Sequence, residues 1–221
     1  MSQPCIIAAS ILSANFAHLG RESKAILKAG ADEIHFDVMD HHFVPNLSFG
    51  SIVCEALRKD GITAPIDVHL MVTNPNDYIK PFAQAGASRL TFHANATDNI
   101  EKTIDLIHAE NMDVGIAFNP DKPVTLSKTL LEKIEMILLM SVFAGFGGQQ
   151  FIPESLEKIR ETKKLIATCN PKILLGIDGG IKVDNIAKVV NAGANFVVMG
   201  SGLFNADDYS ARMNTLRKAI S

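Results

Sequence analysis

Ionisable side chains collect at the ends of several apolar runs in this sequence. His35 and Asp37 lie two residues apart in one run, so on a strand both side chains would point to the same side. His69 ends the next run, and Asp178 ends a later one. Buried groups of this kind are costly unless they are paired or bind a metal ion. Together the four fit Zn²⁺, Fe²⁺ or Mn²⁺, although either histidine taken alone is better explained as a hydrogen-bonded rim residue.

Three glycine-rich segments follow the last three apolar runs. They are Gly145-Phe146-Gly147-Gly148, Asp178-Gly179-Gly180 and Gly200-Ser201-Gly202. Glycine lets backbone N–H groups approach an anion closely, and a following helix start adds positive potential. One pair of glycines would indicate only a turn. Three such segments predict a phosphate-binding site that needs no Lys or Arg.

Three methionines also fall at or just beyond the ends of apolar runs, namely Met39, Met71 and Met140. Methionine usually fills gaps in a core. The functional alternative is an apolar wall that keeps water away from a reactive intermediate. The sequence leaves both interpretations open.

These residues can meet only if the apolar runs are strands of one sheet. The expected strands are Ile6–Ala9, Glu33–Asp37, Ile66–Met71, Arg89–His93, Asp113–Phe118, Met136–Met140, Ile173–Asp178 and Phe196–Met199. The expected helices are Ala17–Lys28, Ser51–Lys59, Asn76–Gln84, Asn99–Ala109, Val124–Leu131, Glu154–Ala167, Val183–Asn191 and one from Asp208. Eight alternating pairs, at roughly 28 residues each, predict an α/β fold of the (β/α)8 barrel type, whose active-site groups lie at the C-terminal ends of the strands.

The chain shows no linker or low-complexity segment, so a single domain over residues 1–221 is expected. A doubly wound sheet is the alternative fold. It would normally carry a Gly-rich dinucleotide loop after the first strand, and Ser10-Ile11-Leu12-Ser13 is not one.

Phe16 and Leu27 are expected to pack into the core from helix faces.

Composition excludes several other classes of protein. The chain is 47% hydrophobic and 20% charged with a net charge of −3, which argues against disorder, nucleic-acid binding and attachment to anionic membranes. Three scattered cysteines give no disulfide framework. Met1-Ser2-Gln3-Pro4 does not begin a signal peptide, and the most apolar stretch, 136–146, is too short to span a membrane. We expect a soluble cytoplasmic protein.

The segment His35-Phe36-Asp37-Val38-Met39-Asp40-His41-His42-Phe43-Val44-Pro45-Asn46 closely resembles the ribulose-phosphate 3-epimerase family. Further matches are His69-Leu70-Met71-Val72, Gly145-Phe146-Gly147-Gly148-Gln149 and Asp178-Gly179-Gly180. The resemblance covers essentially the whole chain in order.

The resemblance implies a TIM barrel that interconverts D-ribulose 5-phosphate and D-xylulose 5-phosphate. It also implies one divalent ion (Zn²⁺, Fe²⁺, Mn²⁺ or Co²⁺) bound through His35, Asp37, His69 and Asp178. The two aspartates would be the catalytic acid and base, at Asp37 and Asp178. Ser10 and His69 would contact the ketose phosphate, and the glycine segments with Ser201 would bind its phosphate. Many barrels associate through helix faces, so a homo-oligomer is expected.

The chain departs from the family pattern at three places. It has His41 where the family usually has Gly, Ala144 after Phe143 where the family has Pro, and Asn95 where the family often has Glu. These changes bear on rate and substrate preference more than on reaction type. The alternatives are a 3-epimerase of another ketose phosphate, such as allulose 6-phosphate, and a non-catalytic barrel that binds a sugar phosphate.

Overall fold

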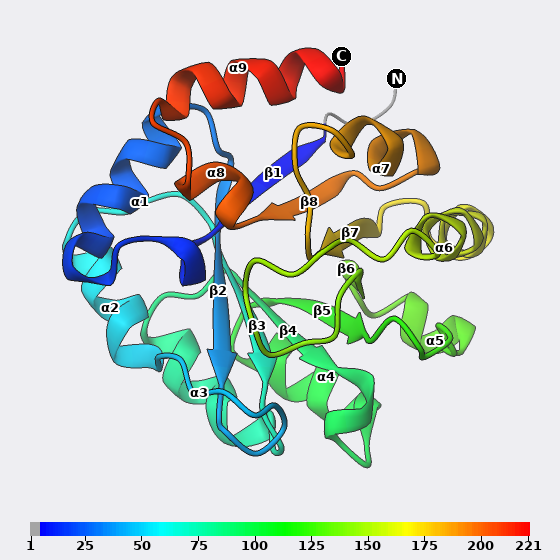
Figure 1. Ribbon diagram of the computed structural model, residues 1–221. Helices are drawn as coiled ribbons and strands as arrows, with labels where there is room; N and C mark the ends of the chain where they lie inside the picture. The colour runs from blue at the N-terminus through cyan, green and yellow to red at the C-terminus, as the bar shows by residue number, and fades with distance from the viewer. Residues whose placement is uncertain (1–4) are drawn as a thin grey trace.

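The strands of this protein form one closed parallel barrel in a computed structural model that describes residues 5–221 (Figure 1). Each strand pairs with its neighbours in sequence, and β1 pairs with β8 to close the sheet. The strands are β1 (Ile6–Ser10), β2 (Glu33–Met39), β3 (Ile66–Met71), β4 (Arg89–His93), β5 (Asp113–Phe118), β6 (Met136–Met140), β7 (Leu174–Asp178) and β8 (Phe196–Met199). The expected (β/α)8 barrel is therefore confirmed.

Helices form a ring outside the strands, as Figure 1 shows. The α-helices are α1 (Leu19–Lys28), α2 (Ser51–Lys59), α3 (Asn76–Gln84), α4 (Ile100–Ala109), α5 (Lys128–Leu131), α6 (Ser155–Cys169), α7 (Ile186–Ala192), α8 (Ser201–Phe204) and α9 (Tyr209–Ala219). Short 3-10 turns are η1 (Ile11–Ser13), η2 (Phe16–His18) and η3 (Ala94–Ala96). Within residues 5–221, no helix is both long enough and apolar enough to cross a membrane. Residues 1–4, which from the sequence are not expected to begin a signal peptide, lie outside the described range.

Several helix boundaries differ from those expected. The fifth helix does not begin at Val124, because the Ser127 side chain accepts a hydrogen bond from the Leu130 N–H and caps a helix that starts only at Lys128. The short helix α8 was not expected at all. The expectation that Phe16 packs into the core is wrong, since it lies in η2 with 52% of its surface exposed.

The interior of the barrel is divided into an apolar and a polar half. β1, β5, β6 and β8 contribute a buried cluster of Ala8, Ala117, Met136, Leu138, Met140, Phe196 and Val198. β2, β3 and β4 instead bury Glu33, His35, Asp37, Asp67, His69, Arg89, Thr91 and His93. The strand register sets these polar residues opposite one another, as in the pairs His35–Asp67 and Asp37–His69. This division brings the ionisable groups together on one side of the barrel.

Candidate active site

Four side chains from β2, β3 and β7 form a buried cluster at the C-terminal end of the barrel. Their possible ligand atoms, from His35, Asp37, His69 and Asp178, all lie within 4.8 Å of one another. Asp37 Oδ1 is 3.3 Å from His35 Nε2 and 3.2 Å from His69 Nδ1. Asp178 Oδ2 is 3.9 Å from the same two nitrogens. The structure thus brings together all four residues that the sequence suggested as metal ligands.

The cluster suits a divalent metal ion chemically. His35 Nε2 is buried and has no hydrogen-bond partner, although it faces the carboxylates of Asp37 and Asp178. A buried ring nitrogen without a partner is unusual, and a metal ion would satisfy it. Two imidazoles and two carboxylates are donors that Zn²⁺, Fe²⁺, Mn²⁺ and Co²⁺ accept. The residues present therefore fit such an ion.

The two carboxyl groups have opposite electrostatic surroundings. Burial alone would raise the pKa of Asp37, but the adjacent His35 and His69 lower the pKa below its usual range. Burial, together with the charge of Asp37, raises the pKa of Asp178 to about 6. Burial opposes a charge on His35, yet Asp37 and Asp67 raise its pKa well above the usual value. A divalent ion entering this site would displace a proton from His35.

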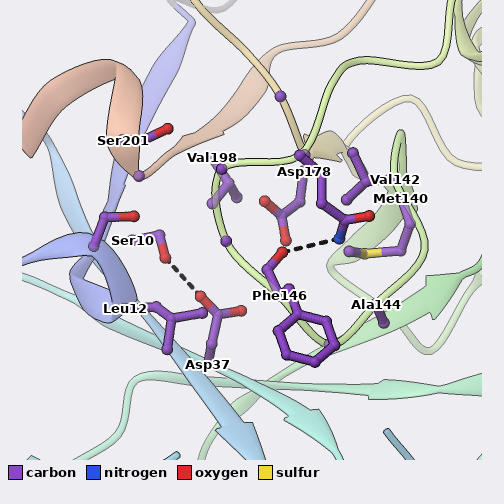
Figure 2. Close-up of a pocket in the computed structure, with 18 of the residues that line it drawn as sticks. Ser10, Leu12, Asp37, Met140, Val142, Ala144, Phe146, Asp178, Val198 and Ser201 are labelled. Carbon is purple, nitrogen blue, oxygen red and sulfur yellow. Dashed lines mark hydrogen bonds between the residues drawn. The ribbon is translucent and has the colours of Figure 1, made fainter. Parts of the chain in front are cut away.

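A cavity opens above this cluster at the centre of the strand ends (Figure 2). Apart from Gly202, which is buried, the other site residues suggested by the sequence line it: Ser10, Met39, Met71, Met140, Gly145, Phe146, Gly147, Gly148, Gly179, Gly180, Gly200 and Ser201. Asp37 and Asp178 also line the cavity, whereas His35 and His69 do not and are fully buried. Ser10 Oγ donates a hydrogen bond of 2.6 Å to Asp37 Oδ2. The cavity therefore combines the carboxylates, the three methionines and the glycine loops.

The end of β7 is held by a residue that the sequence did not single out. The Ser141 hydroxyl donates to the carbonyl oxygens of Asp178, at 2.9 Å, and Gly179, at 2.7 Å. Gly180 follows with φ of +66°, and a Cβ there would lie 2.4 Å from the Phe151 nitrogen. Only glycine fits this position. The geometry of the loop after Asp178 is thus fixed by a neighbouring hydroxyl and by close backbone approach.

Two loops from opposite parts of the chain meet at the mouth of the cavity. The Asn46 Nδ2 group donates to the Gly145 carbonyl at 2.8 Å, across 99 residues of sequence. Gln149 Nε2 donates to the carbonyls of Phe143 and Phe146, at 2.7 and 2.9 Å, and so closes the loop after β6 on itself. Asn46 and Gln149 belong to the segments that resemble the epimerase family, but the sequence predicted no role for either residue. The Asn46 contact depends on tertiary structure, whereas the Gln149 contacts lie within one loop, six and three residues away.

The three departures from the family pattern occupy different places. Ala144 lines the cavity and packs near Met39, whereas Phe143 is exposed. His41 adopts a left-handed conformation with φ of 61°, which glycine adopts more easily. Asn95 lines a separate hollow beside the ends of β4 and β5, and does not line the cavity.

Comparisons with known proteins agree with this geometry. The model of the "Ribulose-phosphate 3 epimerase family" matches residues 6–204. The chain is 51% identical to the ribulose-phosphate 3-epimerase of Buchnera aphidicola subsp. Acyrthosiphon pisum over 97% of this chain and 94% of that protein. It is 46% identical to the Escherichia coli K12 ribulose-phosphate 3-epimerase, over 98% of this chain and 96% of that protein.

Solved structures show the same architecture at much lower identity. The crystal structure of KGPDC from Streptococcus mutans superposes with a TM-score of 0.68 at 16% identity, covering 99% of this chain and 98% of that one. A likeness at this identity concerns the fold alone. The family match and the two close relatives carry the assignment further: the chain belongs to the ribulose-phosphate 3-epimerase family and is an epimerase.

Proposed function

We propose that this chain, acting as one catalytic domain, interconverts D-ribulose 5-phosphate and D-xylulose 5-phosphate by moving the proton on C3 between the two faces of the sugar. The observation that carries this proposal is the pair Asp37 and Asp178, which line one cavity and have pKa values shifted in opposite directions. Groups with separated pKa values suit paired acid and base roles. The curated relatives are named for the same reaction.

In the direction of xylulose phosphate, Asp37 takes the C3 proton and Asp178 returns a proton from the opposite face. The roles exchange in the reverse direction, so the enediolate intermediate is protonated on either face. Ser10 donates to Asp37 Oδ2 and so leaves Asp37 Oδ1 on the side of the histidines. This hydrogen bond limits rotation of the Asp37 carboxylate.

His35, Asp37, His69 and Asp178 would hold one divalent ion, and these donors suit Zn²⁺, Fe²⁺, Mn²⁺ and Co²⁺. When bound, such an ion supplies Lewis-acid stabilisation of the negative charge that develops on the substrate oxygen. Met39, Met71 and Met140 line the cavity with apolar surface that offers no proton to the intermediate. They would exclude water while the two aspartates control protonation.

The phosphate of the substrate would lie against the loops after β6, β7 and β8. Gly147, Gly179 and Gly200 line this side of the cavity together with Ser201. Their backbone N–H groups and the Ser201 hydroxyl can donate to phosphate oxygens. Binding at this distant group fixes the orientation of C3 between the carboxylates.

A coupled assay on D-ribulose 5-phosphate tests the proposal, with allulose 6-phosphate as a second substrate. We expect turnover of the pentose phosphate, and a loss of at least about 100-fold in Asp37→Asn and in Asp178→Asn. In deuterated water, Asp178→Asn should still exchange the C3 proton of D-ribulose 5-phosphate slowly, and Asp37→Asn that of D-xylulose 5-phosphate, each without completing epimerisation. An active Asp178→Asn protein would refute the two-base scheme. Preference for the hexose phosphate would assign the alternative substrate, and binding without turnover would indicate a non-catalytic barrel.

A further inference from the structure

Beneath the cluster, the polar half of the barrel contains a second set of buried groups that the proposed reaction does not use. His35 Nδ1, on the side of the ring away from Asp37, lies 2.8 Å from Asp67 Oδ2. Asp67 and His35 are both fully buried and face each other across β2 and β3. The outer nitrogen of His35 therefore has an anionic partner inside the barrel.

Asp67 is itself held from the opposite direction. Its second oxygen, Oδ1, accepts a hydrogen bond of 3.2 Å from Thr91 and lies 3.6 Å from the Arg89 guanidinium. Arg89 Nη1 also donates to Glu33 Oε2 at 3.1 Å, and the guanidinium lies over the Phe196 ring, 5.1 Å from its centroid. The two oxygens of Asp67 are thus divided between different partners, so the carboxylate cannot turn without losing contacts.

The arrangement decides which nitrogen of His35 faces the cluster. A neutral imidazole carries its proton on one ring nitrogen only. With Asp67 accepting from Nδ1–H, the lone pair of His35 is on Nε2, the atom directed at Asp37 and Asp178. A carboxylate behind a ligand histidine also makes that histidine a stronger donor. Metal-binding histidines in general depend on such partners for orientation.

We propose that Asp67, braced by Arg89, is a positioning residue that holds His35 with Nε2 toward the metal ion. This inference rests on the proposed metal site. Arg89 acts on His35 only indirectly, because its guanidinium limits the rotation of the Asp67 carboxylate. Neither residue lines the cavity, so neither touches the substrate.

The dissociation constant of Zn²⁺, measured by competition with a chromophoric chelator, tests this role. Loss of an outer partner typically weakens metal binding about 10- to 100-fold, and we expect that loss in Asp67→Asn. Arg89→Met should give a smaller weakening, and Arg89→Lys should recover part of it. Glu33→Gln is the matched control, because it also neutralises a buried carboxylate beside Arg89 but does not contact His35. It should bind Zn²⁺ within about threefold of the wild-type value.

The absorption spectrum of the Co²⁺-loaded protein provides a second measurement that a merely structural role would not change. Its visible bands should shift in Asp67→Asn and remain as in the wild-type protein in Glu33→Gln. If Asp67→Asn does not fold, Thr91→Val removes only the hydroxyl that braces Asp67, and a weakening of a few-fold is expected there.

The outcomes separate this inference from the metal site on which it rests. Wild-type Zn²⁺ affinity in Asp67→Asn, or in Thr91→Val where that variant is needed, would overturn the positioning role alone. Equal losses in Asp67→Asn and Glu33→Gln would overturn it too, because the cause would then be interior charge. A wild-type protein that binds neither Zn²⁺ nor Co²⁺ would overturn the metal site, and this inference with it.

Discussion

Asp37 and Asp178 show how the same side chain acquires different properties from its neighbours. Asp37 lies within 3.3 Å of two histidine nitrogens and accepts a hydrogen bond from Ser10, so its charged form is stabilised. Asp178 lies farther from those nitrogens, at 3.9 Å, and close to the charge of Asp37. The difference in proton affinity between the two groups follows from these contacts.

The raised pKa of Asp178 predicts a pH-dependent stability in the metal-free protein. The folded pKa is about 6, above the value of about 4 for an unfolded chain. Between these values the folded state retains a proton that the unfolded state has released, so stability falls as the pH rises through this window. Above pH 6 the charged Asp178 therefore destabilises the metal-free fold.

Asp178→Asn removes this charge. In chelator-treated protein at pH 8, we expect its free energy of unfolding to exceed that of the wild-type protein by about 1–3 kcal/mol. The gain should shrink toward zero below pH 4, where the wild-type Asp178 is protonated in both states. Urea unfolding of both proteins at the two pH values measures the difference. A gain of equal size at pH 4 and pH 8 would contradict the prediction.

At the scale of elements, the loops after β2 and β6 are joined at the cavity mouth by one hydrogen bond from Asn46 to Gly145. Asn46 Oδ1 also accepts from the Leu47 N–H at 2.9 Å, within its own loop. Asn46→Asp keeps this second contact but replaces the amide donor with a carboxylate oxygen and adds a negative charge, whereas Asn46→Ala removes both contacts and adds no charge. The two variants together therefore test the contact between the two loops.

We expect Asn46→Asp to raise KM for the ketose phosphate about fivefold or more, since a hydrogen bond of this kind contributes about 1 kcal/mol. Turnover at saturation should change less, because the aspartates and the barrel remain in place. Steady-state kinetics with Asn46→Ala alongside measures both constants. An unchanged KM in Asn46→Asp would show that the contact does not order the mouth.

His41 offers a second prediction for the same loop. Its φ of 61° and exposed side chain leave little to offset left-handed strain, so His41→Gly should stabilise the fold by about 0.5–1 kcal/mol. Asn111, with φ of 59° just after α4, is a matched comparison: asparagine tolerates this conformation better than histidine does, so its replacement by Gly should stabilise the fold less. Urea midpoints of the two variants test this. A destabilised His41→Gly protein would show that the side chain makes a contact that matters.

The strands could be predicted from sequence because each is a buried apolar run, and both faces of a barrel strand are covered. The site followed from one rule, that catalytic groups lie at the C-terminal ends of such strands. Asp67 could have been found as well, since it lies two residues before His69 and must point to the same side. Asn46 and Ser141 could not, because their partners lie in other loops that meet them only in the folded chain. Gln149 could not either, because nothing in a glycine-rich loop indicates which nearby carbonyls a glutamine side chain will contact.

At the scale of the whole molecule, the apolar half of the barrel interior supports the fold and the polar half supports the chemistry. Met136, Leu138 and Phe196 fill one side, while Arg89 and Asp67 lie buried on the other beneath the cluster. Buried ionisable groups in such numbers are costly unless they are paired or hold an ion. In the proposed function, a metal ion held by the cluster would connect the stability of this half to its reaction.

Titration of metal ion into chelator-treated protein, with turnover of D-ribulose 5-phosphate measured at each step, tests that connection most directly. We predict that metal-free protein has negligible activity, and that turnover rises in proportion to added Zn²⁺ or Co²⁺ until one ion is bound per chain. Replacement of His35 or His69 by alanine should abolish that rise. Full turnover in protein shown to be free of metal, or no turnover once one ion per chain is bound, would contradict a metal-assisted epimerisation at this site.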